Sequence, residues 1–196
     1  MDESARKNAD SRGVDFSRRR MLAGVGAGAL ALGLAPLGTA MARTAGSEVR
    51  GLSLVNLYTS ESVAIDYFAN GAYIPEALRE LDRFMRDPID GTRRRMNPAL
   101  YDLLNGIYRL METPLPFHLI SGYRSPKTNA MLRRRSRGVA RRSLHMSGLA
   151  ADIRLPGRDL EDLRRAAKAL KRGGVGLYTR SNFIHVDTGR LRSWGV

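Results

Sequence analysis

The chain of 196 residues contains no cysteine, and this absence limits both its fold and its chemistry. Disulfide bonds, thiolate metal sites and a cysteine nucleophile are excluded. The fold must therefore be held by an apolar core, for which the 43% of hydrophobic residues provide enough material. Any metal ion must be bound through nitrogen and oxygen atoms. The histidines that could supply nitrogen ligands number three, and they are His118, His145 and His185.

The first 42 residues have the pattern of a secretory signal peptide. Arg18 and Arg19 precede an apolar segment, 23–37, and a small-x-small sequence ends at Ala42. The paired arginines predict a twin-arginine signal, which would direct the protein through the twin-arginine translocase to the periplasm. We expect cleavage after Ala42, so that residues 43–196 form one domain with no stable membrane anchor. Retention of the apolar segment as a membrane anchor is the alternative.

The formal net charge of +14 predicts a surface that attracts polyanions. Nucleic acid, anionic lipid and the carboxylate-bearing polymers of a cell wall all meet that condition. Six arginines lie in the segment 133–142, and no aromatic residue separates them. Proteins that bind single-stranded nucleic acid combine a basic groove with aromatic residues on which bases stack. This pattern and the export signal together argue against a nucleic-acid partner.

The spacing of apolar residues predicts a single α+β domain with a mainly antiparallel sheet. Two strands at 50–59 and 62–68 are expected to form a hairpin. Helix starts are marked by Pro75, by Asn97 and by Asp159, since Asn and Asp are common N-caps and Pro is common in the first turn. The other expected elements are a helix from about 127 and strands at 117–120, 149–155, 175–178 and 183–187.

Two short segments place histidine and aspartate side chains where a metal ion could bind. Asp152 follows His145 by seven residues and lies in an apolar strand, where a carboxylate is costly unless it is paired or bound to a metal. In the strand 183–187, alternation puts His185 and Asp187 on one face. Two histidines and one carboxylate would leave a zinc ion one position for water, as in catalytic zinc sites. A hydrogen-bonded core histidine and a capping aspartate are the alternatives that spacing leaves open.

Several motifs in a fixed order resemble the YcbK-type zinc peptidases. They are Ser-Gly-Tyr-Arg-Ser-Pro at 121–126, Thr-Asn at 128–129, Ser-x-His-x-x-Gly-x-Ala-x-Asp at 143–152, Gly-Val-Gly-x-Tyr at 174–178 and Phe-x-His-x-Asp-Thr-Gly at 183–189. That family belongs with the zinc D-Ala-D-Ala carboxypeptidases and murein endopeptidases, which share an HxxGxAxD metal motif and the hedgehog/DD-peptidase fold. The resemblance covers about residues 50–194 and identifies 43–196 as a zinc peptidase-like catalytic domain.

The resemblance implies roles for individual residues. Arg124 matches an arginine that contacts the substrate near the scissile amide, where a guanidinium could stabilise the developing oxyanion. Ser143 matches a serine that binds the carboxylate end of the substrate, and Tyr123, beside Arg124 in the same motif, is assigned to substrate binding. The zinc ligands would be His145, Asp152 and His185.

The general base is where the sequence departs from that family. Relatives usually place Glu three residues before the last histidine ligand, or His two before it, and here these positions hold Asn182 and Phe183. Neither side chain can take a proton from zinc-bound water. Asp187 is the best remaining candidate, with a solvent-linked base as the other choice. Asp187 could equally accept a hydrogen bond from a ligating imidazole and fix its tautomer.

The sequence therefore predicts an exported, periplasmic zinc metallopeptidase that hydrolyses amide bonds in peptidoglycan stem peptides or crosslinks during cell-wall remodelling. The bond itself stays open between D-Ala-D-Ala, D-Ala-diaminopimelate and a direct diaminopimelate crosslink. The missing Glu or His base supports one alternative, a non-catalytic cell-wall-binding protein with a degenerate zinc site.

Overall fold

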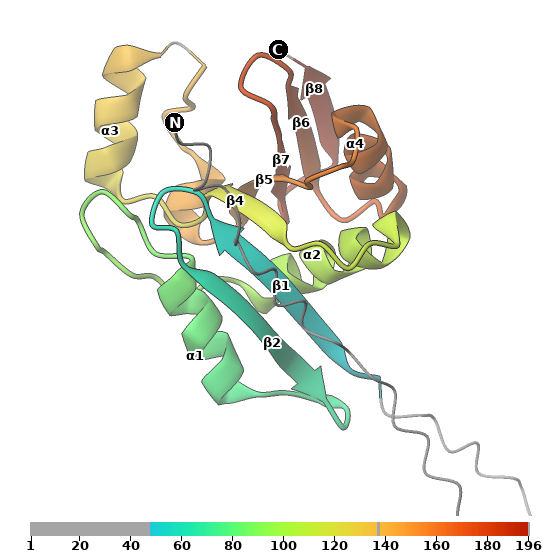
Figure 1. The fold of residues 1–196 in the computed structure, drawn as a ribbon. Coiled ribbons are helices and arrows are strands. Elements are labelled where there is room, and N and C mark those ends of the chain that lie inside the picture. The colour runs from blue at the N-terminus through green and yellow to red at the C-terminus, as the bar shows by residue number, and fades with distance from the viewer. Residues whose placement is uncertain (1–47, 137, 196) are drawn as a thin grey trace, which may run out of the picture. The chain divides into compact units, whose positions relative to one another are not determined.

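The computed structural model describes residues 48–136 and 138–195, so the predicted signal peptide lies outside the described residues. Strands and helices are interspersed along this part of the chain (Figure 1). No helix among the described residues is long and apolar enough to cross a membrane. In chain order the elements are β1 (Arg50–Asn56), β2 (Ser62–Ala69), β3 (Ala72–Tyr73), α1 (Pro75–Phe84), α2 (Pro98–Met111), β4 (Phe117–Ser121), α3 (Pro126–Arg135), the 3-10 helix η1 (Leu144–Ser147), β5 (Ala150–Arg154), α4 (Leu160–Ala169), β6 (Gly174–Tyr178), β7 (Phe183–Asp187) and β8 (Arg192–Gly195).

The strands form one sheet with the order β3-β2-β1-β4-β5-β7-β6-β8. Two neighbouring pairs, β1 with β4 and β6 with β8, are parallel. The other five pairs are antiparallel, including the predicted hairpin of β1 and β2. The predicted class, a mixed α+β domain with a mainly antiparallel sheet, is confirmed.

Three helices begin at side chains that cap free backbone N–H groups. Asn97 Oδ1 accepts a hydrogen bond from the backbone N–H of Ala99 at the start of α2, and Asp159 Oδ1 accepts one from Glu161 at the start of α4. Both caps were expected from the sequence. Ser125 does the same for α3, whose first residue is Pro126. Each cap satisfies one of the donors that a helix start leaves unpaired.

The apolar core lies between the sheet and three helices. α1 packs on β2, α2 packs on β1, and α4 packs on β6, β7 and α2. Leu54, Leu104 and Ile184 in this core have no exposed surface. By contrast, α3 buries only the polar residues Thr128 and Asn129, and Figure 1 draws it apart from the strands, next to the chain that leads to η1.

A row of paired residues crosses the strands β5, β7, β6 and β8 and positions the candidate site. Asp152 on β5 pairs with His185 on β7, and His185 pairs with Gly176 on β6. Gly176 in turn pairs with Trp194 on β8. Directly paired residues project from the same face of a sheet. Asp152, His185 and Trp194 therefore lie on one face, although they are far apart in the sequence.

The structure also contains elements that the sequence did not predict. η1 carries His145, and it ends at Gly148 with a φ of 69°. A Cβ at Gly148 would come within 2.8 Å of the Arg95 carbonyl oxygen, so both the backbone conformation and the packing require glycine. The strands β3 and β8 are the other two additions, and each is short and lies at an edge of the sheet.

Candidate metal centre

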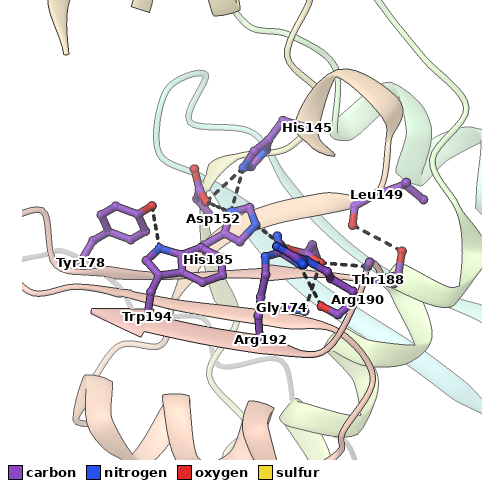
Figure 2. A network of polar contacts seen from close by, with 12 residues as sticks. His145, Leu149, Asp152, Gly174, Tyr178, His185, Thr188, Arg190, Arg192 and Trp194 are labelled. Carbon is purple, nitrogen blue, oxygen red and sulfur yellow. Dashed lines mark hydrogen bonds and ion pairs between the residues drawn. The ribbon is translucent and has the colours of Figure 1, made fainter. Parts of the chain in front are cut away.

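Three potential ligand atoms meet at one point on the sheet face. His145 Nε2 lies 3.1 Å from His185 Nδ1 and 3.2 Å from Asp152 Oδ1, and His185 Nδ1 lies 2.9 Å from the same Asp152 oxygen. Figure 2 shows the three side chains pointing toward one another. They come from η1, β5 and β7, and all three are at least nine-tenths buried.

The hydrogen bonds on the far sides of the two imidazoles define their tautomers. His145 Nδ1 lies 2.7 Å from the carbonyl oxygen of Gly122, and His185 Nε2 lies 3.0 Å from Asp187 Oδ2. A carbonyl or carboxylate oxygen accepts hydrogen bonds, so each of these nitrogens carries a proton. In the neutral imidazoles, His145 Nε2 and His185 Nδ1 therefore both present a lone pair to the Asp152 carboxylate. A positive charge between these two nitrogens and the carboxylate oxygen would therefore be stabilised.

The pKa values show the same preference for positive charge. Burial lowers the pKa of His185, but the hydrogen bonds to Asp152 and Asp187 outweigh this and raise it to about 9. Burial raises the pKa of Asp152, yet the neighbouring histidines hold it well below its usual range. The position therefore stabilises a cation, whether a proton on His185 or a metal ion.

The donor set and its spacing fit zinc. Zinc forms bonds of roughly 2.0–2.1 Å to histidine nitrogen and to carboxylate oxygen in tetrahedral sites, which places neighbouring ligand atoms about 3.3 Å apart. The three separations in the site, 2.9 to 3.2 Å, are slightly shorter than that value. His145, Asp152 and His185 thus form a group that could hold a metal ion, with one tetrahedral position left for water or substrate.

Asp187 lies behind His185 and has no exposed surface. Its Oδ2 accepts the hydrogen bond from His185 Nε2, and Arg192 binds both carboxylate oxygens at 2.6 and 3.1 Å. The backbone N–H groups of Gly174 and Gly189 donate to Oδ1. With burial opposed by these contacts, the pKa of Asp187 is lowered. A carboxylate so enclosed and so weakly basic does not suit the expected role as general base, and its geometry favours the other interpretation, which is orientation of His185.

Arg124 contacts the metal ligand directly. Its Nη2 lies 3.3 Å from Asp152 Oδ2 and 3.2 Å from Ser121 Oγ. Asp152 thus offers Oδ1 to the two histidines and Oδ2 to the guanidinium. Arg124 also lines a pocket of about 270 Å³ that opens at the metal group, where it can contact a bound molecule.

The two residues expected to bind substrate occupy different environments. Ser143 lines the same pocket immediately before η1. Tyr123 is 5% exposed and belongs to the apolar core, and it does not line the pocket. The structure therefore shows no contact between Tyr123 and the pocket, and its assignment to substrate binding stays a prediction. Its backbone N–H donates to the Met85 carbonyl oxygen, and a Cβ at Gly122 would lie 2.6 Å from that oxygen, so the turn packs tightly on Met85.

Sequence reasoning missed the residues that the last strand brings to the site. Arg192 and Trp194 on β8 both line the pocket, together with Tyr178 and Phe183 from the β6–β7 hairpin. The glycines of the motif Gly174-Val-Gly were a usable signal, because a Cβ at Gly174 would collide with Arg192 and Asp187.

Among the described residues that line the pocket, Asp152 is the only carboxylate. Phe183 lines it as an aromatic ring that stacks on Tyr178, and Asn182 is a turn residue with a φ of 54°. Among the described residues that line the pocket, no other acidic side chain takes the place of the Glu or His that relatives carry at positions 182 and 183.

Comparison with known proteins gives consistent matches across the chain. A family model described as peptidoglycan L,D-endopeptidase MepK matches residues 44–194. The chain is 44% identical to the peptidoglycan L,D-endopeptidase MepK of Escherichia coli (strain K12) over 181 residues, which is 92% of this chain and 98% of that protein. It is 38% identical to the probable peptidoglycan L,D-endopeptidase MepK of Haemophilus influenzae over 183 residues, which is 92% of this chain and 97% of that protein. The matched region includes every residue of the metal group.

Proposed function

Because the chain belongs to the peptidoglycan L,D-endopeptidase MepK family, we propose that it hydrolyses an L,D-amide bond in peptidoglycan with a zinc ion held by His145, Asp152 and His185. The peptidase family predicted from the sequence motifs is confirmed. An L,D bond joins a carbon of L configuration to one of D configuration. Of the three bonds considered, the direct diaminopimelate crosslink fits this description, whereas the D-Ala-D-Ala and D-Ala-diaminopimelate bonds join two D centres.

The observation that carries the proposal is the convergence of three acceptor atoms within 3.2 Å of one another in a pocket wall. The far-side hydrogen bonds to Gly122 and Asp187 direct the correct nitrogen of each imidazole to that point. Such orientation of ligating histidines is a general feature of zinc sites. Zinc bound there would polarise the scissile carbonyl and lower the pKa of a bound water toward ~7.

The protein's own groups have separate tasks in this scheme. Arg124 extends into the pocket beside Asp152 and stabilises the oxyanion that forms when the amide carbonyl is attacked. Ser143 lines the pocket near His145 and binds a substrate carboxylate by donating its hydroxyl proton. Asp187 holds the proton on His185 Nε2 and so keeps Nδ1 free for the metal. Since Asp187 is enclosed, a solvent-linked base in the open pocket would take the proton of the attacking water and return it to the leaving amine.

Export completes the proposal. The twin-arginine pattern at Arg18-Arg19 supports delivery of the folded domain to the periplasm, with cleavage after Ala42. The family model begins its match at residue 44, which is consistent with a catalytic domain of 43–196. We take the mainly antiparallel sheet, with candidate metal ligands from η1, β5 and β7, as the hedgehog/DD-peptidase fold in this chain.

Positions 182 and 183 hold Asn and Phe in place of the expected Glu or His. This favours one competing function, a non-catalytic protein that binds the wall through a degenerate zinc site. Only the peptidase would cleave peptidoglycan repeatedly, whereas the competing protein would bind it without cleavage. We would purify the protein without its signal, measure bound zinc, and assay the release of muropeptides from sacculi that contain diaminopimelate crosslinks. Cleavage that His145→Ala abolishes supports the peptidase, and bound zinc without cleavage supports the competing function.

His118→Ala is the matched control for that experiment. His118 is the one other histidine of the chain; its Nδ1 accepts a hydrogen bond from Arg154 on β5, and neither residue lines the pocket. This variant should retain the zinc content and the cleavage rate of the wild type. Loss of zinc in both variants would show that the assay reports folding instead of metal ligation.

A further inference from the structure

Trp194 reaches the metal group from two strands away. It lies on β8 opposite Gly176, and Gly176 lies opposite His185. The centroid of the indole ring is 5.4 Å from that of the His185 imidazole. Figure 2 shows the indole beside His185 and under the Tyr178 hydroxyl. The side chain therefore spans the width of one intervening strand.

Gly176 makes this approach possible. A Cβ at position 176 would lie 2.4 Å from Cε2 of the indole and 2.5 Å from Cζ2. These are ring atoms of a rigid side chain, so even an alanine would force the ring to move. The glycine between His185 and Trp194 thus provides the space that the indole occupies.

Two contacts fix the orientation of the indole. Its Nε1–H donates a hydrogen bond of 3.1 Å to the Tyr178 hydroxyl, and the Arg192 guanidinium lies 5.0 Å from the ring. Tyr178 stacks in turn on Phe183, with 4.7 Å between ring centroids. The aromatic wall, which we define as Trp194, Tyr178 and Phe183, is therefore ordered before any ligand binds.

This wall faces the pocket and not only the core. All three of its residues line the pocket that contains the metal group, and none of them is fully buried. Arginines also line it, namely Arg124, Arg142 and Arg192. A fixed, partly exposed aromatic surface near guanidinium groups suits a ligand with a flexible aliphatic chain and carboxylates at its ends.

We propose that Trp194 is a substrate-contacting residue that determines specificity by packing its indole against the methylene chain of a diaminopimelate residue next to the scissile bond. The inference rests on the proposed function and adds a site to it. Removal of two or three methylenes from water against the indole should change affinity on the order of tenfold or more.

Steady-state kinetics on a diaminopimelate-crosslinked muropeptide dimer tests the proposal with the zinc-loaded protein. Trp194→Ala should raise KM on the order of tenfold while kcat and zinc content change little. Trp194→Phe keeps an aromatic surface and should recover most of the loss. Gly176→Ala should resemble Trp194→Ala, because it displaces the ring without removing it. Leu191→Ala, an exposed apolar truncation just before β8 and outside the pocket lining, is the control that should match the wild type.

Fluorescence provides a second reading, since Trp194 is the sole tryptophan of the chain. Addition of the cleaved muropeptide monomer to the zinc-loaded wild type should change the emission of Trp194, as expected when a ligand covers the indole. An unchanged KM in Trp194→Ala together with an unchanged emission overturns this inference alone. A wild-type protein that never cleaves the dimer overturns the proposed function instead.

Discussion

Arg192 binds both carboxylate oxygens of Asp187, at 2.6 and 3.1 Å, from a strand that the sequence did not predict. This bidentate pair keeps Asp187 ionised behind His185 and directs the lone pair of His185 Nδ1 toward Asp152. The metal group is therefore supported by a chain of contacts that runs from β8 through β7 to β5.

Replacement of Asp187 separates its two possible roles. Asp187→Asn keeps the shape but removes the charge that holds the His185 tautomer, so we expect zinc affinity to fall roughly 10–100-fold. Competition with a chelator of known affinity measures this. If Asp187 were the general base, zinc affinity would stay at the wild-type value while kcat collapsed. Thr188→Ser, a mild change next to it in the chain, is a suitable control.

Removal of the Arg124 guanidinium should lower kcat. Arg124→Ala takes away a donor aimed into the pocket beside Asp152, and loss of such an oxyanion contact typically costs about 10²–10³ in kcat. Assays at saturating substrate check this, with zinc content measured in parallel. Arg133→Ala removes the same charge from α3 and should leave kcat unaltered. A wild-type kcat in Arg124→Ala would contradict the proposed role.

Arg142 should bind substrate through its charge. It is exposed at the pocket, where carboxylates of the crosslink would approach. We expect Arg142→Ala to raise KM a few-fold at low ionic strength, and the difference to shrink at high salt because exposed charges are screened. Arg172→Ala, which changes another exposed arginine outside the pocket lining, serves for comparison. Equal salt dependence of both variants would assign the effect to net charge alone.

The cap of α4 provides a test of stability without a direct effect on chemistry. Asp159→Ala removes the acceptor of the Glu161 N–H, which should lower the free energy of unfolding by about 1 kcal/mol. Thermal or denaturant unfolding measures the change, and Asp159→Asn should restore most of it. Equal stability of wild type and Asp159→Ala would show that the cap contributes nothing in this context.

The sequence predicted the local features of the fold because each has a local physical cause. The caps at Asn97 and Asp159 follow from side chains that satisfy nearby N–H groups, and the hairpin of β1 and β2 follows from alternation next to a turn. His145, Asp152 and His185 were placed together through motif resemblance, and spacing alone had left other roles open. The structure adds the atoms involved, since His145 Nε2 and His185 Nδ1 are the nitrogens that face each other.

The features that the sequence did not predict are contacts that depend on strand register and packing. Tyr123 was assigned to substrate binding, and the close packing of Gly122 on Met85 places it in the core, so that this assignment stays a prediction. Trp194 and Arg192 reach the site through the parallel pairing of β8 with β6, which joins residues about eighteen positions apart. No periodicity within a four-residue strand reports such a pairing. The enclosure of Asp187 depends on the same strand, so its role could not be decided from the sequence.

The most direct test of the account is the position of a metal in crystals of the zinc-loaded protein, located by anomalous scattering at the zinc edge. We predict one peak at roughly 2.0–2.1 Å from His145 Nε2, His185 Nδ1 and Asp152 Oδ1. A peak bound to other atoms of these side chains, or none near them in protein that cleaves peptidoglycan, would contradict it.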